Sequence, residues 1–215
     1  SVKNSMLNLI CVSIPVVEGR ILLNVKDTTK LPEHKRLRSI GRVYQNPAMG
    51  TCPHMTILEN MALADNKGKA FNLLPGTNRQ RIDYYRESLK TLGLGLEDKM
   101  EVKVGVLSGG QRQAMALLMS TMTPIEFLIL DEHTAALDPK TAETIMELTD
   151  KIVREKKLTT IMVTHNLRYA VDYGNRLLMM HQGTIVIDKA DEEKDAVQID
   201  EILKKFNEIS IECGN

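Results

Sequence analysis

Residues 127–138 are F-L-I-L-D-E-H-T-A-A-L-D, an apolar run that ends in two acids. Four consecutive apolar residues predict a buried β-strand, and Asp131 and Glu132 stand where that strand ends. Carboxylates in this position can hold a divalent cation and polarise an attacking water. Acids also end strands without any chemical role. The stretch therefore predicts a strand and leaves both interpretations of its acids open.

A second apolar run, T-T-I-M-V-T at 159–164, predicts another buried strand and is followed by His165. The segment between the two runs has the apolar spacing of an amphipathic helix. Strands that alternate with helices favour a mostly parallel sheet with helices on both faces, where ligands bind beyond the carboxyl ends of the strands. A histidine at such an end is either a structural residue or a catalytic one.

The remaining segments predict a lobe and a tail. A helical pattern at about 55–94 interrupts the alternation and indicates an inserted helical lobe. Residues 176–188 predict a hairpin, and residues 196–209 a last amphipathic helix. Near the start, residues 6–14 predict a helix that Pro15 ends, and residues 18–27 a turn followed by a short β-like run.

Composition limits the class of protein. The 215 residues can form one good core, and the 28 basic residues equal the 28 acidic ones, so no broad field favours nucleic acid or anionic lipid. The sequence has neither a secretory signal pattern nor an apolar run near the roughly 20 residues that cross a bilayer. Cys11, Cys52 and Cys213 lack the spacing of metal ligands and are expected to be free thiols. We expect a soluble cytoplasmic α/β protein.

Residues 107–113, L-S-G-G-Q-R-Q, give a sharper signal. Ser108 can cap a helix, while Gly109 and Gly110 leave the backbone amides open to a ligand at the positive end of the helix dipole. A phosphate is the group best suited to that place. The alternative is a plain helix cap with two glycines. The presence of D-E-H-T-A-A-L-D and T-H in the same chain favours the phosphate site.

Taken in order, these motifs resemble those of ABC-type ATPases, the nucleotide-binding subunits of membrane transporters. The resemblance covers nearly the whole chain. It implies an α/β, P-loop NTPase-like fold with a mostly parallel sheet, helices on both faces and an inserted helical subdomain. A single domain of residues 1–215 is expected. Its core lobe would comprise about 1–45 and 114–190, its helical lobe about 46–113, and its C-terminal helix about 191–215.

The resemblance also implies roles for single residues. In V-Y-Q-N, Gln45 would touch the metal and the attacking water and report to the membrane subunit. Asp131 would handle Mg²⁺, and Glu132 would be the general base. Asp138 would end the D-loop, and His165 would contact the γ-phosphate of ATP. The signature motif, whose implied nucleotide contacts are Ser108, Gly109, Gly110 and Gln111, would complete the ATP site of a second subunit.

The opening stretch, S-V-K-N-S-M-L-N-L-I, is either the end of a phosphate loop or the start of an ordinary helix. Beside the family pattern G-x-x-x-x-G-K-[ST] it matches the end of the loop, with Lys3 as the phosphate lysine. Asn4 replaces the hydroxyl that binds Mg²⁺, Ser5 is a mild change, and Val2 replaces a glycine and would crowd the phosphate. The family's preceding strand, glycines and adenine-stacking aromatic then lie before residue 1. We therefore expect the strand at 127–130 to have an unpaired edge.

Two smaller departures, His133 for proline and Ala135 for serine, resemble a branch of bacterial ABC ATPases that work with solute-binding-protein importers. That branch implies uptake of a small, amino-acid-like solute. Two chains, in a homodimer or a heterodimer, would enclose two ATP molecules with Mg²⁺. The helical segment after Gln45 would dock on membrane subunits at the inner face of the cell membrane, and a solute-binding protein would be an indirect partner.

Two hypotheses of different class follow from the same motifs. In the first, the chain hydrolyses ATP. In the second, it is a non-hydrolysing regulatory partner whose altered phosphate loop is inactive and whose signature motif serves another chain's site. ATP binding with and without a competent partner separates them. A role in DNA maintenance is disfavoured because long heptad segments and a basic surface are missing, so no nucleic-acid partner is expected.

Overall fold

A computed structural model describes residues 2–11, 16–69, 76–77 and 79–212 of the protein. The chain forms two compact units, one of Leu7–Val163 and one of Ser1–Met6 with Thr164–Asn215. The boundaries expected for the core lobe, the helical lobe and the C-terminal helix stay a prediction, because the compactness of these units does not test them.

Three parallel strands form the sheet of the larger unit, in the order β3-β4-β5. Both apolar runs are strands, as predicted, and Asp131 of β4 lies opposite Val163 of β5. The expected unpaired edge at 127–130 is wrong, because β3 and β5 pair with β4 from either side. Among the described residues β3 and β5 are the two edge strands, each paired only with β4. The strands are β3 (Ile40–Val43), β4 (Phe127–Asp131) and β5 (Thr159–Val163).

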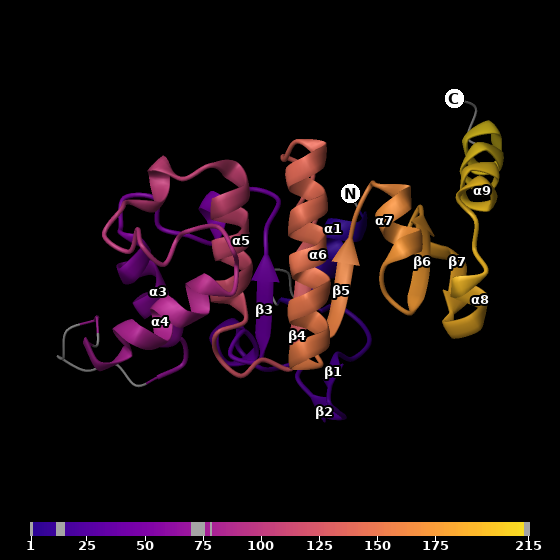
Figure 1. The fold of residues 1–215 in the computed structure, drawn as a ribbon. Helices are drawn as coiled ribbons and strands as arrows, with labels where there is room; N and C mark the ends of the chain where they lie inside the picture. Colours follow the sequence, from indigo (N-terminus) through magenta and orange to yellow (C-terminus); the bar gives the residue numbers. More distant parts are fainter. Residues whose placement is uncertain (1, 12–15, 70–75, 78, 213–215) are drawn as a thin grey trace. The chain divides into compact units, whose positions relative to one another are not determined.

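Helices cover both faces of this sheet, as predicted. On one face Leu117 of α5 (Gly109–Ser120) and Ile152 of α6 (Pro139–Lys156) pack on the alternate strand residues Val43, Leu128 and Leu130. The helix α6 lies in front of β4 in Figure 1, and the end of α1 lies behind the sheet. Since neighbouring strand residues point to opposite faces, residues 42, 129 and 131 face the α1 side.

The helix α1 (Val2–Ile10) begins four residues earlier than predicted and ends at Ile10. The predicted stop at Pro15 lies outside the described residues. Buried Arg36 binds the helix end by donating from Nη1 to the carbonyl oxygens of Leu9 and Ile10, each at 3.1 Å. Such a cation satisfies carbonyl groups that have no partner within the helix.

The β-like run predicted before residue 28 is a two-stranded antiparallel hairpin. Asn24 and Val25 form its turn with positive φ angles of 46° and 67°. A valine rarely adopts this conformation, so the residue types did not indicate a turn there. The hairpin consists of β1 (Leu22–Leu23) and β2 (Lys26–Asp27), and α2 (Glu33–Arg36) follows it.

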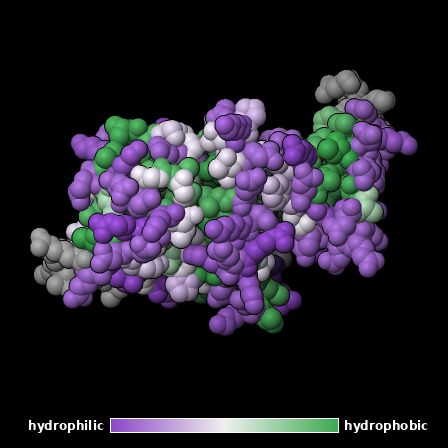
Figure 2. All heavy atoms as spheres, in the orientation of Figure 1, coloured by the Kyte–Doolittle hydropathy of each residue, from purple (hydrophilic) through white to green (hydrophobic). Residues whose placement is uncertain are grey.

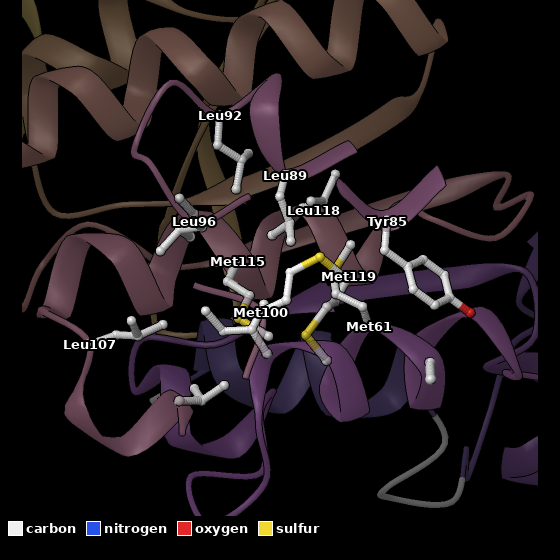
Figure 3. Close-up of a cluster of buried hydrophobic side chains, with 14 of the residues drawn as sticks. Met61, Tyr85, Leu89, Leu92, Leu96, Met100, Leu107, Met115, Leu118 and Met119 are labelled. Atoms are coloured by element: carbon white, nitrogen blue, oxygen red, sulfur yellow. The ribbon is translucent and has the colours of Figure 1, made fainter. Parts of the chain in front are cut away.

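A second core joins the predicted helical segments to α5. Methionines 61, 100, 115 and 119 fill much of it, and the long flexible side chains converge from several helices and loops in Figure 3. Because α5 contributes to this core and to the sheet core, it connects the helical segments to the sheet. The elements are η1 (Pro47–Met49), α3 (Ile57–Asp65), η2 (Arg79–Arg81), α4 (Ile82–Lys90) and η3 (Val104–Val106).

The smaller unit contains the predicted hairpin and C-terminal helix, together with a short polar helix, α8, that the sequence did not indicate. Leu177, Val197 and Ile202 form its core. Hydrophobic side chains also gather on the surface along α9 in Figure 2, where Phe206 is 57% exposed. None of the described helices is long and apolar enough to span a membrane. The elements are α7 (Leu167–Asp172), β6 (Arg176–His181), β7 (Thr184–Ala190), α8 (Asp191–Asp195) and α9 (Ile199–Glu212).

Candidate functional site

The two predicted acids lie at the carboxyl end of β4. Asp131 is the last strand residue, and its side chain is only 14% exposed. The carboxylate is paired, because Arg42 Nη2 lies 2.7 Å from Asp131 Oδ2. A half-buried carboxylate with a fixed partner has the oxygen chemistry that Mg²⁺ prefers.

The reasoning from sequence missed Arg42, which lies on β3 with its side chain 12% exposed. Its Nη1 donates to Asn8 Oδ1 at 3.2 Å, and its guanidinium lies 4.7 Å from the centre of the Tyr44 ring. Burial alone would lower the pKa of Arg42, but the hydrogen bond to Asp131 and the nearby charges of Cys11, Tyr44 and Asp131 together outweigh burial, so the pKa lies above its usual value. One signal was available: in parallel strands, 42 and 131 fall on the same face once their register is known.

Glu132 follows Asp131 with a positive φ of 49°. Its N–H donates to the carbonyl of Val163 at 2.9 Å, and its own carbonyl accepts from Ala135 N–H at 3.0 Å. These bonds hold a left-handed conformation that costs a residue with a side chain about 1–2 kcal/mol.

His133 is buried against α6, with 2% of its surface exposed. Its Nε2 lies 3.1 Å from Thr149 Oγ1, and that hydroxyl donates to the carbonyl of Ile145 at 2.6 Å. The hydroxyl oxygen therefore accepts from Nε2–H of a neutral imidazole. Burial lowers the pKa of His133 to about 4, which agrees with this form. His133 anchors the loop after Glu132 to α6.

The signature motif begins α5 as predicted. Ser108 Oγ accepts from Gln111 N–H at 3.2 Å, and Gln111 Oε1 accepts from Ser108 N–H at 3.1 Å, which makes a reciprocal capping box. A Cβ atom on Gly110 would lie 2.4 Å from Thr141 Cγ2. Close packing on α6 therefore requires glycine at 110 without reference to a ligand. The expected phosphate contacts of this motif stay a prediction.

Asp138 and the signature motif meet at Thr141. Asp138 Oδ1 accepts from Thr141 N–H at 3.1 Å and so caps α6, while the methyl group of Thr141 contacts Gly110. Hydrogen bonds from Thr141 lower the pKa of Asp138. The D-loop and the first turn of α5 are thus held together by the first turn of α6.

The other predicted site residues lie in three further segments of the chain. Gln45 is exposed in the bend that follows β3. His165 lies in the smaller unit, two residues beyond Val163 in the chain, and is also exposed. Lys3, Asn4 and Ser5 lie in the first half of α1, and their side chains lie outside the described part of the chain.

Comparison with known proteins places these motifs in a family. A family model described as "ABC transporter" matches residues 3–135, more than half of the chain. The "Tyrosine transport ATP-binding protein" of Clostridioides difficile (strain R20291) is 48% identical over 204 residues, which are 95% of this chain and 81% of that protein. The "Thiamine import ATP-binding protein ThiQ" of Histophilus somni (strain 129Pt) is 33% identical and covers 84% of this chain and 79% of its own length.

The fold has solved counterparts as well. The ATP-binding cassette MJ0796, in a dimeric post-hydrolysis state bound to ADP and Pi, superposes with a TM-score of 0.71 at 29% identity. The match covers 87% of this chain and 80% of that one. The order of the motifs, the parallel sheet and these relatives agree: this chain belongs to the ABC transporter family, as an ATP-binding subunit.

Proposed function

We propose that this ATPase subunit powers the uptake of a small amino-acid-like solute, with tyrosine as the first candidate. The support is the relative named for tyrosine transport, which is 48% identical across 95% of this chain. Relatives named for thiamine, carnitine and glutamine are only 30–33% identical, so these solutes are weaker candidates than tyrosine.

We further propose Glu132 as general base, beside a Mg²⁺ ion that Asp131 helps to hold. The observation that carries this is the placement of both acids at the end of the central strand, where Glu132 is fixed by hydrogen bonds from its own N–H and to its own C=O. A main chain held in place limits the rearrangement needed for the side chain to accept a proton from water. The family pattern assigns Gln45, His165 and Lys3 to the metal, the attacking water and the phosphates, and we propose these roles from the sequence motifs alone.

Mg²⁺ fits these residues as an ion shared with nucleotide. Among the described residues, no group of three or more His, Cys, Asp or Glu side chains could hold a metal. Mg²⁺ usually keeps several waters and takes one or two carboxylates together with substrate phosphates. Asp131 would supply the carboxylate and Asn4 an amide oxygen, and the bound ion would neutralise phosphate charge.

We propose that two such subunits, identical or different, enclose ATP head to tail and dock on membrane subunits at the inner face of the cell membrane. The support is the dimeric state of the related MJ0796 cassette and the capped amino end of α5, whose amides suit a phosphate presented by a neighbour. Closure around ATP and reopening after hydrolysis would move the membrane subunits. The solute-binding protein would act only through them.

One observation keeps the non-hydrolysing alternative in view. Val2 and Asn4 replace a glycine and a hydroxyl residue of the family's phosphate loop. A chain impaired there could still offer its capped α5 to the ATP site of a competent partner.

The test is ATP binding and turnover by the purified protein, alone and with its membrane subunits. Glu132→Gln should lower turnover at least about 100-fold, because a general base contributes that much, and should leave ATP binding intact. Glu147→Gln, which changes an exposed glutamate on α6, is the matched control and should change neither. Turnover that survives Glu132→Gln contradicts the assigned base. Turnover that needs a second ATPase chain supports the alternative. Tyrosine uptake into proteoliposomes with the complete transporter tests the solute.

A further inference from the structure

The Arg42–Asp131 pair has a feature that the general chemistry of the site does not explain. The two side chains are 12% and 14% exposed, so this ion pair is largely removed from water. Separating a buried pair leaves an uncompensated charge, which is far less favourable than separating a surface pair. The carboxylate of Asp131 therefore has one strongly preferred position, set by Arg42.

Arg42 itself is fixed by three contacts, with β4, with α1 and with the residue just beyond β3. Nη2 binds Asp131 on β4, Nη1 binds Asn8 on α1, and the guanidinium stacks on Tyr44 just beyond β3. The planar fork of an arginine can bind two acceptors at once in a fixed geometry, whereas a lysine offers a single ammonium group. Arg42 thus relates the position of the Asp131 carboxylate to that of α1, the helix that begins with the phosphate-loop match.

We propose that Arg42 is a positioning residue for the metal-binding carboxylate of Asp131, and that it sets the affinity of the protein for Mg²⁺ with nucleotide. This inference rests on the proposed role of Asp131. The pair engages Oδ2 only, so Oδ1 is left for the metal or its water shell. Partners that hydrogen-bond to metal ligands orient those ligands, and their loss typically lowers metal affinity about 10–100-fold.

The experiment measures metal affinity without turnover. Mn²⁺ bound together with ATP is followed by electron paramagnetic resonance, and ATP affinity is measured by calorimetry in Mg²⁺ and in EDTA. Arg42→Met should weaken metal binding about tenfold or more and leave ATP affinity in EDTA nearly unchanged. Arg42→Lys should recover part of the loss, because an ammonium can pair with Asp131 but cannot also hold Asn8.

Two further variants show whether the effect passes through Asp131. Asp131→Asn removes the carboxylate, and in that background Arg42→Met should cause no further loss of metal affinity, since coupled residues are not additive. Arg81→Met is the matched control. It breaks an arginine–aspartate pair of similar length, 2.6 Å from Arg81 Nη2 to Asp65 Oδ1, in the helical segments. It should leave metal affinity unchanged.

Asn8→Ala keeps the test decisive if Arg42→Met does not fold, as judged by circular dichroism. It removes only the α1 acceptor of Arg42, and we expect a smaller loss of metal affinity, about threefold. In the Asp131→Asn background Asn8→Ala should cause no further loss. If Asn8→Ala leaves metal affinity unchanged while Arg42→Met does not fold, the inference fails.

The outcomes separate the inference from the proposed function. If Asp131→Asn leaves metal affinity unchanged, or the wild-type protein shows no metal-dependent binding of ATP, the proposed role of Asp131 is wrong and the inference falls with it. If Asp131→Asn acts but Arg42→Met does not, only the inference is wrong. Tighter metal binding in Arg42→Met would overturn it too, because the guanidinium would then be a competitor of the metal.

Discussion

At the scale of single residues, His133 shows how a departure from the family pattern can be structural and still affect the site. Its imidazole is buried and hydrogen-bonded to Thr149, and the backbone preceding it adopts the left-handed conformation of Glu132. The histidine therefore fixes the loop that follows Glu132, the proposed general base.

We predict that Thr149→Val destabilises the protein by about 1–3 kcal/mol, because the buried Nε2–H of His133 loses its acceptor. The free energy of unfolding from urea titration measures this. In a His133→Leu background no donor remains, so Thr149→Val should then be nearly neutral. An equal loss in both backgrounds would show that Thr149 contributes through packing alone.

Reasoning from sequence found the residues whose chemistry is local and missed those whose role depends on register. Ser108 and Asp131 were predicted because a cap and a strand end are visible in a short window. Arg42 was missed because nothing within its own segment indicates that it faces Asp131, which is 89 residues away in the chain. Only the pairing of β3 with β4 shows this.

At the scale of elements, the contact between α5 and α6 offers a test of why the signature motif contains glycine. A Cβ atom at 110 would overlap the methyl group of Thr141, at 2.4 Å from Cγ2. Packing requires glycine here, and the proposed approach of a phosphate would require it too. The two explanations predict different results when the methyl group of Thr141 is removed.

We predict that Gly110→Ala destabilises the protein by about 1–3 kcal/mol through overpacking. Adding Thr141→Ser should recover the lost stability, because it removes the methyl group that the new Cβ atom would overlap. Alanine also has the higher helix propensity, which helps the double variant. Thermal melts measure stability, and ATP turnover is measured alongside. If the amides at 110 contact phosphate, turnover stays low in the restored protein. A double variant as unstable as Gly110→Ala would refute the packing explanation.

Strong periodicity made most elements predictable. The features that were missed are those that no local sequence pattern contains. The apolar runs of β4 and β5 and the amphipathic pattern of α6 were identified. The helix α8 has no apolar face in its five residues, D-E-E-K-D, so no period could indicate it. The prediction of an unpaired edge on β4 was wrong because β3 and β5 pair with it from either side. The chain returns through α6 to place β5 beside β4, an order that local patterns do not contain.

At the scale of the whole molecule, the helical segments depend on a buried charge. The Asp65 carboxylate accepts from Arg81 Nε and Nη2 at 2.9 and 2.6 Å and from the Tyr85 hydroxyl at 3.0 Å. Burial alone would raise the pKa of Asp65, but these hydrogen bonds and the charge of Arg81 outweigh it, so the pKa lies below its usual value. Burial and Asp65 together raise the pKa of Tyr85 to about 12.

A depressed pKa in the folded state stabilises the protein above the unfolded pKa of about 3.9, and this stability is lost as the pH falls through the folded pKa. We predict that Asp65→Asn costs about 1–3 kcal/mol at pH 7 by weakening the hydrogen bonds from Arg81 and Tyr85 to the side-chain oxygens, and flattens the loss of stability on acidification. Urea unfolding between about pH 7 and 2 measures both effects. Asp83→Asn, at a carboxylate 92% exposed, is the control and should do little. An unchanged acid slope in Asp65→Asn would contradict this.

The left-handed backbone at Glu132 implies a conflict between the stability of the fold and the proposed catalytic role of this residue. Glycine is the residue best suited to that conformation, so exchanging Glu132 for glycine would relax the main chain while deleting the carboxylate. A laboratory lineage selected only for heat resistance would be free to accept this exchange. If Glu132 is the general base, as proposed, a lineage selected for growth on the transported solute would have to retain the strained residue.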